Sequence, residues 1–200
     1  IGVGEDGPTH QPIEHVMSLR LIPNLHVFRP AEANEAVAMW QAVMALDGPA
    51  TMALTRQNLP TFEDIPLVRA GVKRGAYVIA DSDDKPEVIL LATGSEVHIA
   101  LEAYETLKAD GVKARVVSMP CWELFDAQDA DYKESVIPAD VTARVSIEAG
   151  VTSGWQKYTG MSGINIGIDR FGTSGPMDEV YEAFGLTAEA LVEAAKGLLK

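Results

Sequence analysis

The segment richest in side chains that could bind or react is GEDGPTHQP, residues 4–12. It contains acidic, hydroxyl and imidazole side chains among two glycines and two prolines. Gly7-Pro8 predicts a tight turn, and polar side chains on a rigid turn are well placed to recognise a ligand. Asp6 can accept hydrogen bonds from hydroxyl groups, and His10 can donate, accept or transfer a proton near neutral pH. The alternative is that the acidic and hydroxyl side chains only cap a helix beginning near Gln11, since Asp and Thr are common cap residues.

A second candidate is Arg56, which lies in TRQNLP, residues 55–60, directly after a predicted strand. In open α/β sheets, ligands bind beyond the carboxyl ends of the strands. A guanidinium group suits bidentate binding of phosphate. The alternative is a surface ion pair, which is common for a single arginine. The residues alone leave both interpretations of Arg56 open.

The remaining patterns indicate no further site. Gly94-Ser95 lies at a strand-to-helix turn, where an anion can bind, but the glycine-rich fingerprint is absent and a plain N-cap is the simpler interpretation. His15, His26 and His98 have no Cys or His partner at metal-ligand spacing. Cys121 has no nearby base, so we expect a buried, unreactive thiol. We therefore predict no metal ligand in the chain.

Composition excludes several classes of protein. The 200 residues carry 16 basic and 29 acidic side chains, a formal net charge of −13, with no basic cluster. Since nucleic acids are bound through Lys and Arg stripes, we expect no nucleic-acid partner. No apolar run is longer than five residues, the length of the runs at 76–80 and 88–92, whereas a membrane helix needs roughly 20. One cysteine and no secretory signal pattern suit a reducing compartment, so the expected localisation is cytoplasmic.

Alternating strand and helix patterns predict the α/β class. A strand at 25–28, a helix at 32–46 and a strand at 51–54 form one βαβ pattern, which implies parallel pairing. The clearest pattern joins strands at 88–92 and 114–118 through a helix at 96–109, with Ser95 as its N-cap. The other predicted elements are strands at 77–80 and 141–147 and a C-terminal helix capped by Thr187.

A predicted domain boundary follows the first βαβ pattern. Pro60, Pro66 and Gly71 lie in a stretch with little periodicity, which predicts a linker near residues 57–72. The linker divides the chain into residues 1–66 and residues 67–200. The chain opens with IGVG and no methionine, so we expect it to begin inside a longer polypeptide.

Six motifs together resemble transketolase. They occur in the order of that family, cover nearly the whole chain and are GEDGPTHQPIEH (4–15), FRPAEANE (28–35), TRQNLP (55–60), LLATGSEV (90–97), ARVVSMP (114–120) and GIDRFGTSG (167–175). The resemblance implies that residues 1–66 are the end of the pyrimidine-binding domain, with an incomplete parallel sheet. Residues 67–200 would then be a complete α/β C-terminal domain with a mainly parallel sheet.

Transketolases transfer a two-carbon ketol unit between sugar phosphates, using thiamine diphosphate and Mg²⁺ (or Ca²⁺). The resemblance implies three roles in this chain. Asp6 would hold a sugar hydroxyl near the reacting end. His10 would be the catalytic residue, stabilising or protonating the reacting centre. Arg56 would bind the phosphate at the far end of the sugar.

The chain differs from the family because it lacks the diphosphate-binding domain, which carries a Gly-Asp-Gly…Asn motif. Glu5-Asp6-Gly7 with Asn34 resembles that motif, but the first glycine is missing and Asn34 falls in a predicted helix. We therefore expect no cofactor-binding residue here and predict that the isolated chain is inactive. Residues 1–60 should expose apolar surface or a strand edge, which leads to a homodimer, to association with the missing N-terminal part, or to partial disorder near the N-terminus.

Two other interpretations remain open at this point. The chain fits a non-catalytic dimerisation or regulatory module, because residues 70–200 contain no convincing catalytic constellation. It also fits the C-terminal part of a related thiamine enzyme, such as the β subunit of a 2-oxoacid dehydrogenase or deoxyxylulose phosphate synthase. The pairing of GEDGPTHQP with TRQNLP favours transketolase.

Overall fold

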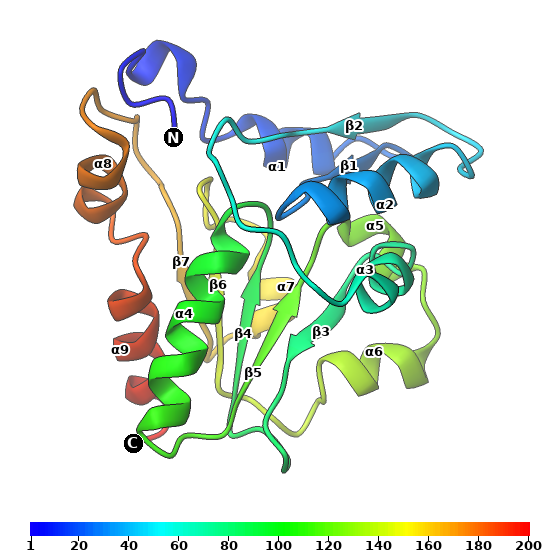
Figure 1. The fold of residues 1–200 in the computed structure, drawn as a ribbon, viewed down its shortest axis with the longest axis vertical. Coiled ribbons are helices and arrows are strands. Elements are labelled where there is room, and N and C mark those ends of the chain that lie inside the picture. Colours follow the sequence, from blue (N-terminus) through cyan, green and yellow to red (C-terminus); the bar gives the residue numbers. More distant parts are fainter.

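The computed structural model describes residues 1–200, in which a small and a large parallel sheet lie one above the other (Figure 1). In the small sheet, β1 (His26–Phe28) pairs in parallel with β2 (Ala50–Met52). The crossover is α2 (Ala33–Val43), which is capped by the carboxylate of Glu32. The first predicted βαβ unit is thus confirmed, with a helix that ends three residues before its predicted end. We call residues 1–72 the small-sheet region.

The large sheet has the strand order β3-β5-β4-β6-β7. Its strands are β3 (Tyr77–Ala80), β4 (Val88–Ala92), β5 (Ala114–Ser118), β6 (Arg144–Ile147) and β7 (Ile164–Ile166). Every pair is parallel except the edge strand β3, which runs antiparallel to β5. This arrangement confirms the predicted mainly parallel sheet. We call residues 77–200 the large-sheet region.

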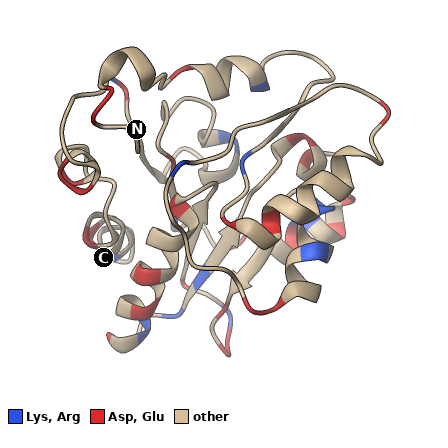
Figure 2. Cartoon of the chain, turned by 45° about the horizontal axis from the view of Figure 1, so that its top comes forward, with Lys and Arg blue, Asp and Glu red and all other residues tan.

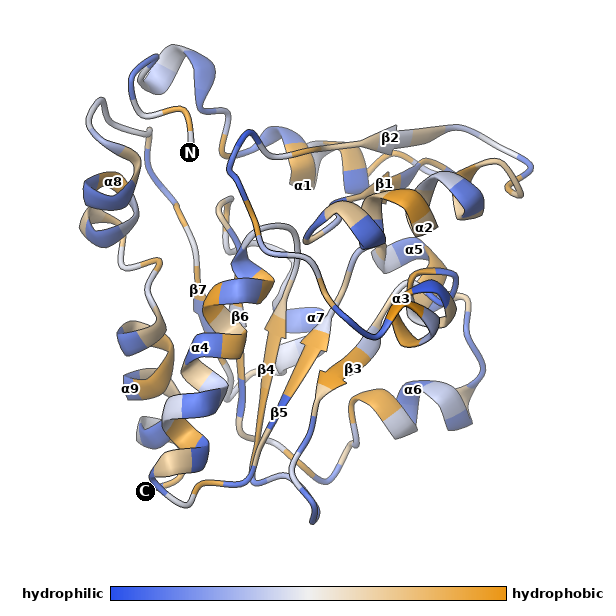
Figure 3. Ribbon diagram, in the orientation of Figure 1, coloured by the Kyte–Doolittle hydropathy of each residue, from blue (hydrophilic) through white to orange (hydrophobic).

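Helices cover both faces of the large sheet, as a parallel sheet requires. On one face, α4 (Glu96–Ala109) and α9 (Ala188–Leu198) pack on Leu90 and its neighbours. On the other face, Ile89 and Leu91 pack against a cluster that includes Trp122 and Trp155. The short helices on that side are α5 (Trp122–Asp126), α6 (Ala130–Val136) and α7 (Gln156–Thr159). The apolar colour of the central strands in Figure 3 follows from this double coverage.

Several predicted features are corrected by the structure. The expected linker contains α3 (Ile65–Val72), which begins at the capping carboxylate of Asp64. Pro66 lies in its first turn, where proline suits a helix, so it starts this helix rather than breaking the chain. Ser95 precedes α4, but its hydroxyl donates to the Glu96 carboxylate instead of capping a backbone N–H. The predicted cap of α9 at Thr187 is confirmed.

The predicted strand at 141–147 starts later, at residue 144. Short elements were missed because three to seven residues show too little periodicity to detect. They are the 3₁₀ helix η1 (Pro8–His10), α1 (His15–Arg20), α5, α6, α7, β7 and α8 (Met177–Ala183). No helix has the length and apolar composition that a membrane crossing needs. Basic residues are interspersed along the ribbon with the more numerous acidic ones (Figure 2).

A buried carboxylate ties α2 to the large sheet. Glu35 is fully buried and accepts hydrogen bonds from Tyr77 Oη at 2.7 Å and Ser118 Oγ at 2.6 Å. Its other oxygen accepts from the backbone N–H of Ala31 at 2.6 Å. Burial raises the pKa of Glu35, and the three donors oppose that rise by stabilising its charged form. The small-sheet region is therefore fixed on the large sheet by directional bonds as well as by packing.

The small-sheet region leaves apolar surface uncovered. On the outer side of α2 and just past its end, Val37, Trp40 and Met44 are 50%, 51% and 79% exposed. The small sheet pairs only β1 with β2, and the outer edge of β2 has no strand partner. The outer edge of β1 is buried and forms one antiparallel bridge, from Phe28 to Cys121. The expected exposure of apolar surface or an unpaired strand edge in residues 1–60 is therefore present, with the edge at β2.

The packing of α9 gives a stability prediction. Leu191→Ala should lower the free energy of unfolding by about 2–5 kcal/mol, because it empties a fully buried site facing α4. Met161→Ala, at a side chain that is 96% exposed, should change it by less than about 0.5 kcal/mol. Urea denaturation followed by circular dichroism measures both. Equal effects of the two substitutions would contradict the assigned core.

Candidate functional site

A cleft of about 230 Å³ lies between the small-sheet region and the carboxyl ends of β4 and β6. His10, Arg56 and Gln57 line it from the small-sheet region. Ser95 and Tyr181 line it from the large-sheet region. The cleft thus lies where open α/β sheets bind ligands, and it contains two of the three residues singled out from the sequence.

Asp6 and Arg56 form an ion pair with each other. Arg56 Nη1 lies 3.2 Å from Asp6 Oδ2, and the side chains are 73% and 44% exposed. The surface ion pair considered for Arg56 therefore exists, but its partner is the other predicted site residue. Since an exposed pair contributes about 0–1 kcal/mol, a ligand phosphate can replace the carboxylate on Arg56 at little cost.

His10 ends the short helix η1 and faces the same cleft as Arg56. The hydroxyl of Thr9 lies 2.9 Å from His10 Nδ1, which leaves Nε2 for a ligand. The cap interpretation of this loop is wrong. Gly7 occupies the N-cap position of η1 with φ of 71°, no side chain caps it, and the next helix begins only at His15.

A buried ion cluster below the cleft was missed from the sequence. Glu148, which follows β6, accepts two hydrogen bonds from Arg20 at 2.8 and 3.0 Å. It also accepts one from Arg29 at 2.7 Å and one from Trp155 Nε1 at 2.8 Å. Burial alone would raise the pKa of Glu148, but the charges of Arg20 and Arg29 lower it to about 2. Glu148 is therefore ionised and fully paired.

Glu96, at the start of α4, is the second buried carboxylate of this cluster. Its Oε2 accepts from Arg29 Nη2 at 3.2 Å and from the Ala149 N–H at 3.0 Å. Its Oε1 accepts from Ser95 Oγ at 2.7 Å and from Tyr181 Oη at 3.1 Å. Burial would lower the pKa of Arg29, but Glu96 and Glu148 together raise it. Ser95 thus helps to hold the carboxylate of Glu96 rather than a ligand anion at the helix N-terminus.

One feature of the sequence could have indicated this cluster, namely charged residues directly after apolar strands. Arg29 directly follows β1, and Glu148 directly follows β6. A charge at such a position is buried once the strands are covered, so it needs a partner. The sequence does not show which charge pairs with which, because 119 residues separate Arg29 from Glu148.

The other histidines and the cysteine considered from the sequence lie outside the cleft. His15 is exposed beside Glu14, and the ring of His98 lies 5.1 Å from that of Phe62. Cys121 is fully buried, and burial raises its pKa, so it stays a protonated thiol. The predicted unreactive character of this thiol agrees with its surroundings.

Two family models match the chain. One describes the pyrimidine-binding domain of transketolase and matches residues 1–61, and the other describes the transketolase-like C-terminal domain and matches residues 75–187. The chain belongs to the transketolase family. It corresponds to the C-terminal region of a transketolase, namely the end of the pyrimidine-binding domain followed by the C-terminal domain.

Whole transketolases from distant organisms are similar to the chain. It is 54% identical to the chloroplastic transketolase of Solanum tuberosum, over 98% of this chain and 27% of that enzyme. It is 50% identical to transketolase 1 of Vibrio vulnificus (strain YJ016), over 100% of this chain and 30% of that enzyme. The chain therefore spans less than a third of the length of these two relatives.

Solved transketolases share the fold. One from Pichia stipitis, in complex with sedoheptulose-7-phosphate, superimposes with a TM-score of 0.89 and 42% identity, over 98% of this chain and 28% of that one. A split-gene transketolase, solved as an inactive β4 tetramer, superimposes with a TM-score of 0.79 and 25% identity. In that case the match covers 96% of this chain and 64% of that one.

Transketolases use thiamine diphosphate, and the resemblance implies a divalent metal beside it. The residues of this chain do not fit a metal–diphosphate group. The 200 residues contain no cluster of three or more His, Cys, Asp or Glu side chains that could hold a metal ion. Asn34, which was weighed for this role, instead donates its amide to the Phe62 carbonyl at 2.9 Å.

The ion cluster gives a prediction for stability against pH. Glu148→Gln should lower the free energy of unfolding near neutral pH by about 3–5 kcal/mol, because it leaves Arg20 buried without a charge partner and Arg29 with Glu96 alone. The pKa of Glu148 is lowered by folding, so its contribution is present above the ordinary pKa of 4.5 and is lost as the pH falls toward about 2. The difference between wild type and variant should therefore shrink over that range.

Urea denaturation near neutral pH and at about pH 3 measures this difference. Glu193→Gln, at an exposed position of α9, is the matched control and should show little effect at either pH. If Glu148→Gln lowers the free energy of unfolding equally at both pH values, the stabilisation by Glu148 is not electrostatic.

Proposed function

We propose that this chain is part of a transketolase that transfers a two-carbon ketol unit between sugar phosphates, and that it holds the sugar phosphate. The observation that carries this proposal is that His10 and Arg56 line one cleft and that Asp6 pairs with Arg56. A carboxylate, an imidazole and a guanidinium there match the hydroxyls, the reacting carbon and the phosphate of such a substrate. The complex of the Pichia stipitis enzyme with sedoheptulose-7-phosphate supports this substrate class.

Each residue has a separate task in this proposal. Arg56 binds the phosphate with its guanidinium, which is exposed and held only by a weak ion pair. Asp6, released from Arg56, accepts hydrogen bonds from sugar hydroxyls near the reacting end. His10 is the catalytic residue, and its free Nε2 donates a proton to the reacting centre or takes one from it.

The cofactor and the domain division also belong to the proposal. Thiamine diphosphate, with Mg²⁺ or Ca²⁺, would supply the ketol-transfer chemistry in the full enzyme and be held by residues outside this chain. The division at residues 66 and 67 is supported by the ranges of the two family models, which leave residues 62–74 between them. The buried, protonated thiol of Cys121 supports a reducing compartment such as the cytoplasm.

We also propose that the isolated chain is inactive and associates with itself, as a dimer or a larger homo-oligomer, or with the rest of the enzyme. Association is supported by the exposed apolar side chains of Val37, Trp40 and Met44 and by the outer edge of β2, which has no strand partner. The likeness to a split-gene transketolase, solved as an inactive β4 tetramer, supports both parts of the proposal. A dimerisation role thus accompanies the substrate-binding role.

Arg56→Ala in the full-length enzyme tests the assigned phosphate contact. The KM for phosphorylated acceptors should rise by about 10-fold or more, because a charge-assisted hydrogen bond contributes roughly 1.5–3 kcal/mol. The KM for a short hydroxyaldehyde without phosphate should change little. Steady-state kinetics with the two acceptors measure the ratio. An equal loss with both acceptors would refute phosphate binding by Arg56.

The isolated 200-residue chain should show no ketol transfer when supplied with thiamine diphosphate, Mg²⁺ and sugar phosphates. In sedimentation experiments it should form a dimer or larger species, which Trp40→Glu should weaken. Met161→Glu, at an exposed side chain of the large-sheet region, is the control. Ketol transfer by the homogeneous chain, or a monomer at all concentrations, would contradict this proposal.

A further inference from the structure

The segment between β7 and α8, residues 167–176, together with Tyr181 in α8, reaches both loops that carry the candidate site. We call residues 167–181 the β7–α8 segment. It belongs to the large-sheet region but passes beside the N-terminal loop, as Figure 1 shows near the label N. Nothing in the assigned roles of Asp6, His10 and Arg56 uses this segment. Its contacts with both loops are therefore a separate feature of the fold.

The first contact holds the loop of Asp6 and His10. The Gly175 N–H donates to the Gly4 carbonyl at 3.0 Å. A Cβ added at Gly4 would lie 2.1 Å from the Gly175 carbonyl oxygen, so the two backbones touch. A Cβ at Gly7, whose φ is 71°, would lie 2.2 Å from Ser174 Oγ. This close packing leaves the loop no room to shift toward the β7–α8 segment.

The second contact holds the loop of Arg56. Gln57, the next residue, donates from Nε2 to Tyr181 Oη at 3.0 Å, and its Oε1 accepts from the Thr55 hydroxyl. Tyr181 Oη in turn donates to Glu96 Oε1 at 3.1 Å. Glu96 is fully buried. Tyr181 is therefore an anchored partner rather than a mobile surface side chain.

Arg56 needs such an anchor because nothing else fixes it strongly. Its side chain is 73% exposed, and its one ion pair is with Asp6, which the substrate would release. The position of the guanidinium must then come from the backbone of its loop. Errors of about 1 Å in the placement of binding groups can reduce rates on the order of 100-fold.

We propose that the β7–α8 segment sets the spacing between the Asp6–His10 loop and Arg56, with Tyr181 as the positioning residue for Arg56 through Gln57. The C-terminal domain thereby fixes the length of sugar phosphate that fits between the reacting end and the phosphate contact. This inference rests on the proposed function. Although Tyr181 lines the cleft, this proposal gives it no contact with the substrate, and it acts on Arg56 through Gln57.

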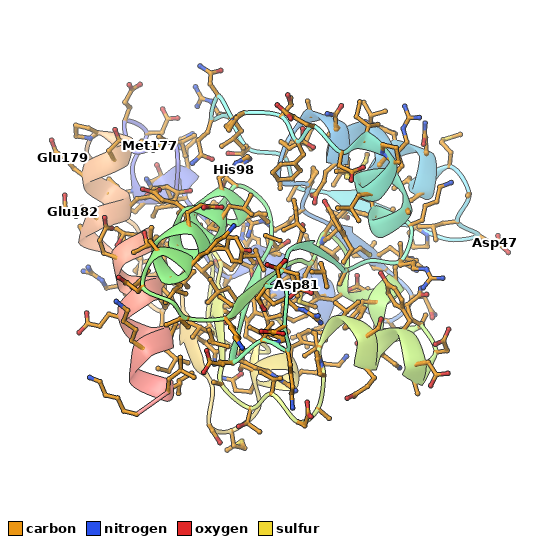
Figure 4. All side chains as sticks on the ribbon, turned by 60° about the horizontal axis from the view of Figure 1, so that its bottom comes forward. Asp47, Asp81, His98, Met177, Glu179 and Glu182 are labelled. Atoms are coloured by element: carbon orange, nitrogen blue, oxygen red, sulfur yellow. The ribbon has the colours of Figure 1, made fainter.

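Tyr181→Phe in the full-length enzyme tests the inference, because it removes one hydroxyl and keeps the ring. The hydroxyl bonds both Gln57 and Glu96, and loss of the bond from Gln57 should raise the KM for a phosphorylated acceptor by about 2–10-fold, the usual effect of one lost hydrogen bond. The kcat, and the KM for a short hydroxyaldehyde without phosphate, should change by less than about 2-fold. Glu179→Gln is the matched control, since Glu179 lies exposed on the outer side of the same helix (Figure 4).

A double-mutant cycle separates positioning from general support of the fold. If Tyr181 acts through Arg56, Tyr181→Phe should add no phosphate-selective loss in an Arg56→Ala background. Gln57→Leu should repeat the effect of Tyr181→Phe from the other end of the hydrogen bond. Additive losses, or equal losses with both acceptors, would overturn the positioning role.

The two proposals fail in distinguishable ways. If Arg56→Ala shows no selectivity for phosphorylated acceptors, the proposed function fails and this inference fails with it. If Arg56→Ala is phosphate-selective while Tyr181→Phe and Gln57→Leu behave like Glu179→Gln, only the positioning role fails. If all three are phosphate-selective and non-additive, both proposals stand.

Discussion

The bidentate pairing of Glu148 with Arg20, completed by Arg29 and Trp155, is the interaction on which the rest of the structure depends. Both arginines come from the small-sheet region, and Glu148 comes from the end of β6. Burying these charges costs several kcal/mol for each ion unless the geometry pairs them fully. The two regions are therefore held in one relative position, since any shift of one region against the other would leave a buried charge without a partner.

The position of the candidate site depends on the same ion cluster. Arg29 lines the cleft and also binds Glu96, which in turn holds Tyr181. The two-stranded sheet has little core of its own, and its buried residues pack with Tyr77 and Cys121 from the large-sheet region. The loops that carry the candidate substrate contacts are thus positioned mainly from outside their own domain.

Much of the fold was predictable from local pattern, because β4 is a continuous apolar strand and α4 has helical spacing between clear ends. Asp6 and His10 stand out in the sequence because of their side-chain types beside the Gly7-Pro8 turn, and Arg56 because it follows a predicted strand; their roles stay predictions. The helix at Ile65–Val72 was missed because Pro66 suggested a break, although proline suits a first turn. The pairing of Glu148 was missed because it depends on residues more than 100 positions apart.

The crystal structure of the full-length enzyme with a bound phosphorylated ketose tests the central claim most directly. The account predicts the phosphate within hydrogen-bond distance of Arg56, a sugar hydroxyl on Asp6, His10 at the reacting end and the bond from Gln57 to Tyr181 retained. A phosphate bound elsewhere, with the ion pair of Asp6 and Arg56 intact, would contradict it.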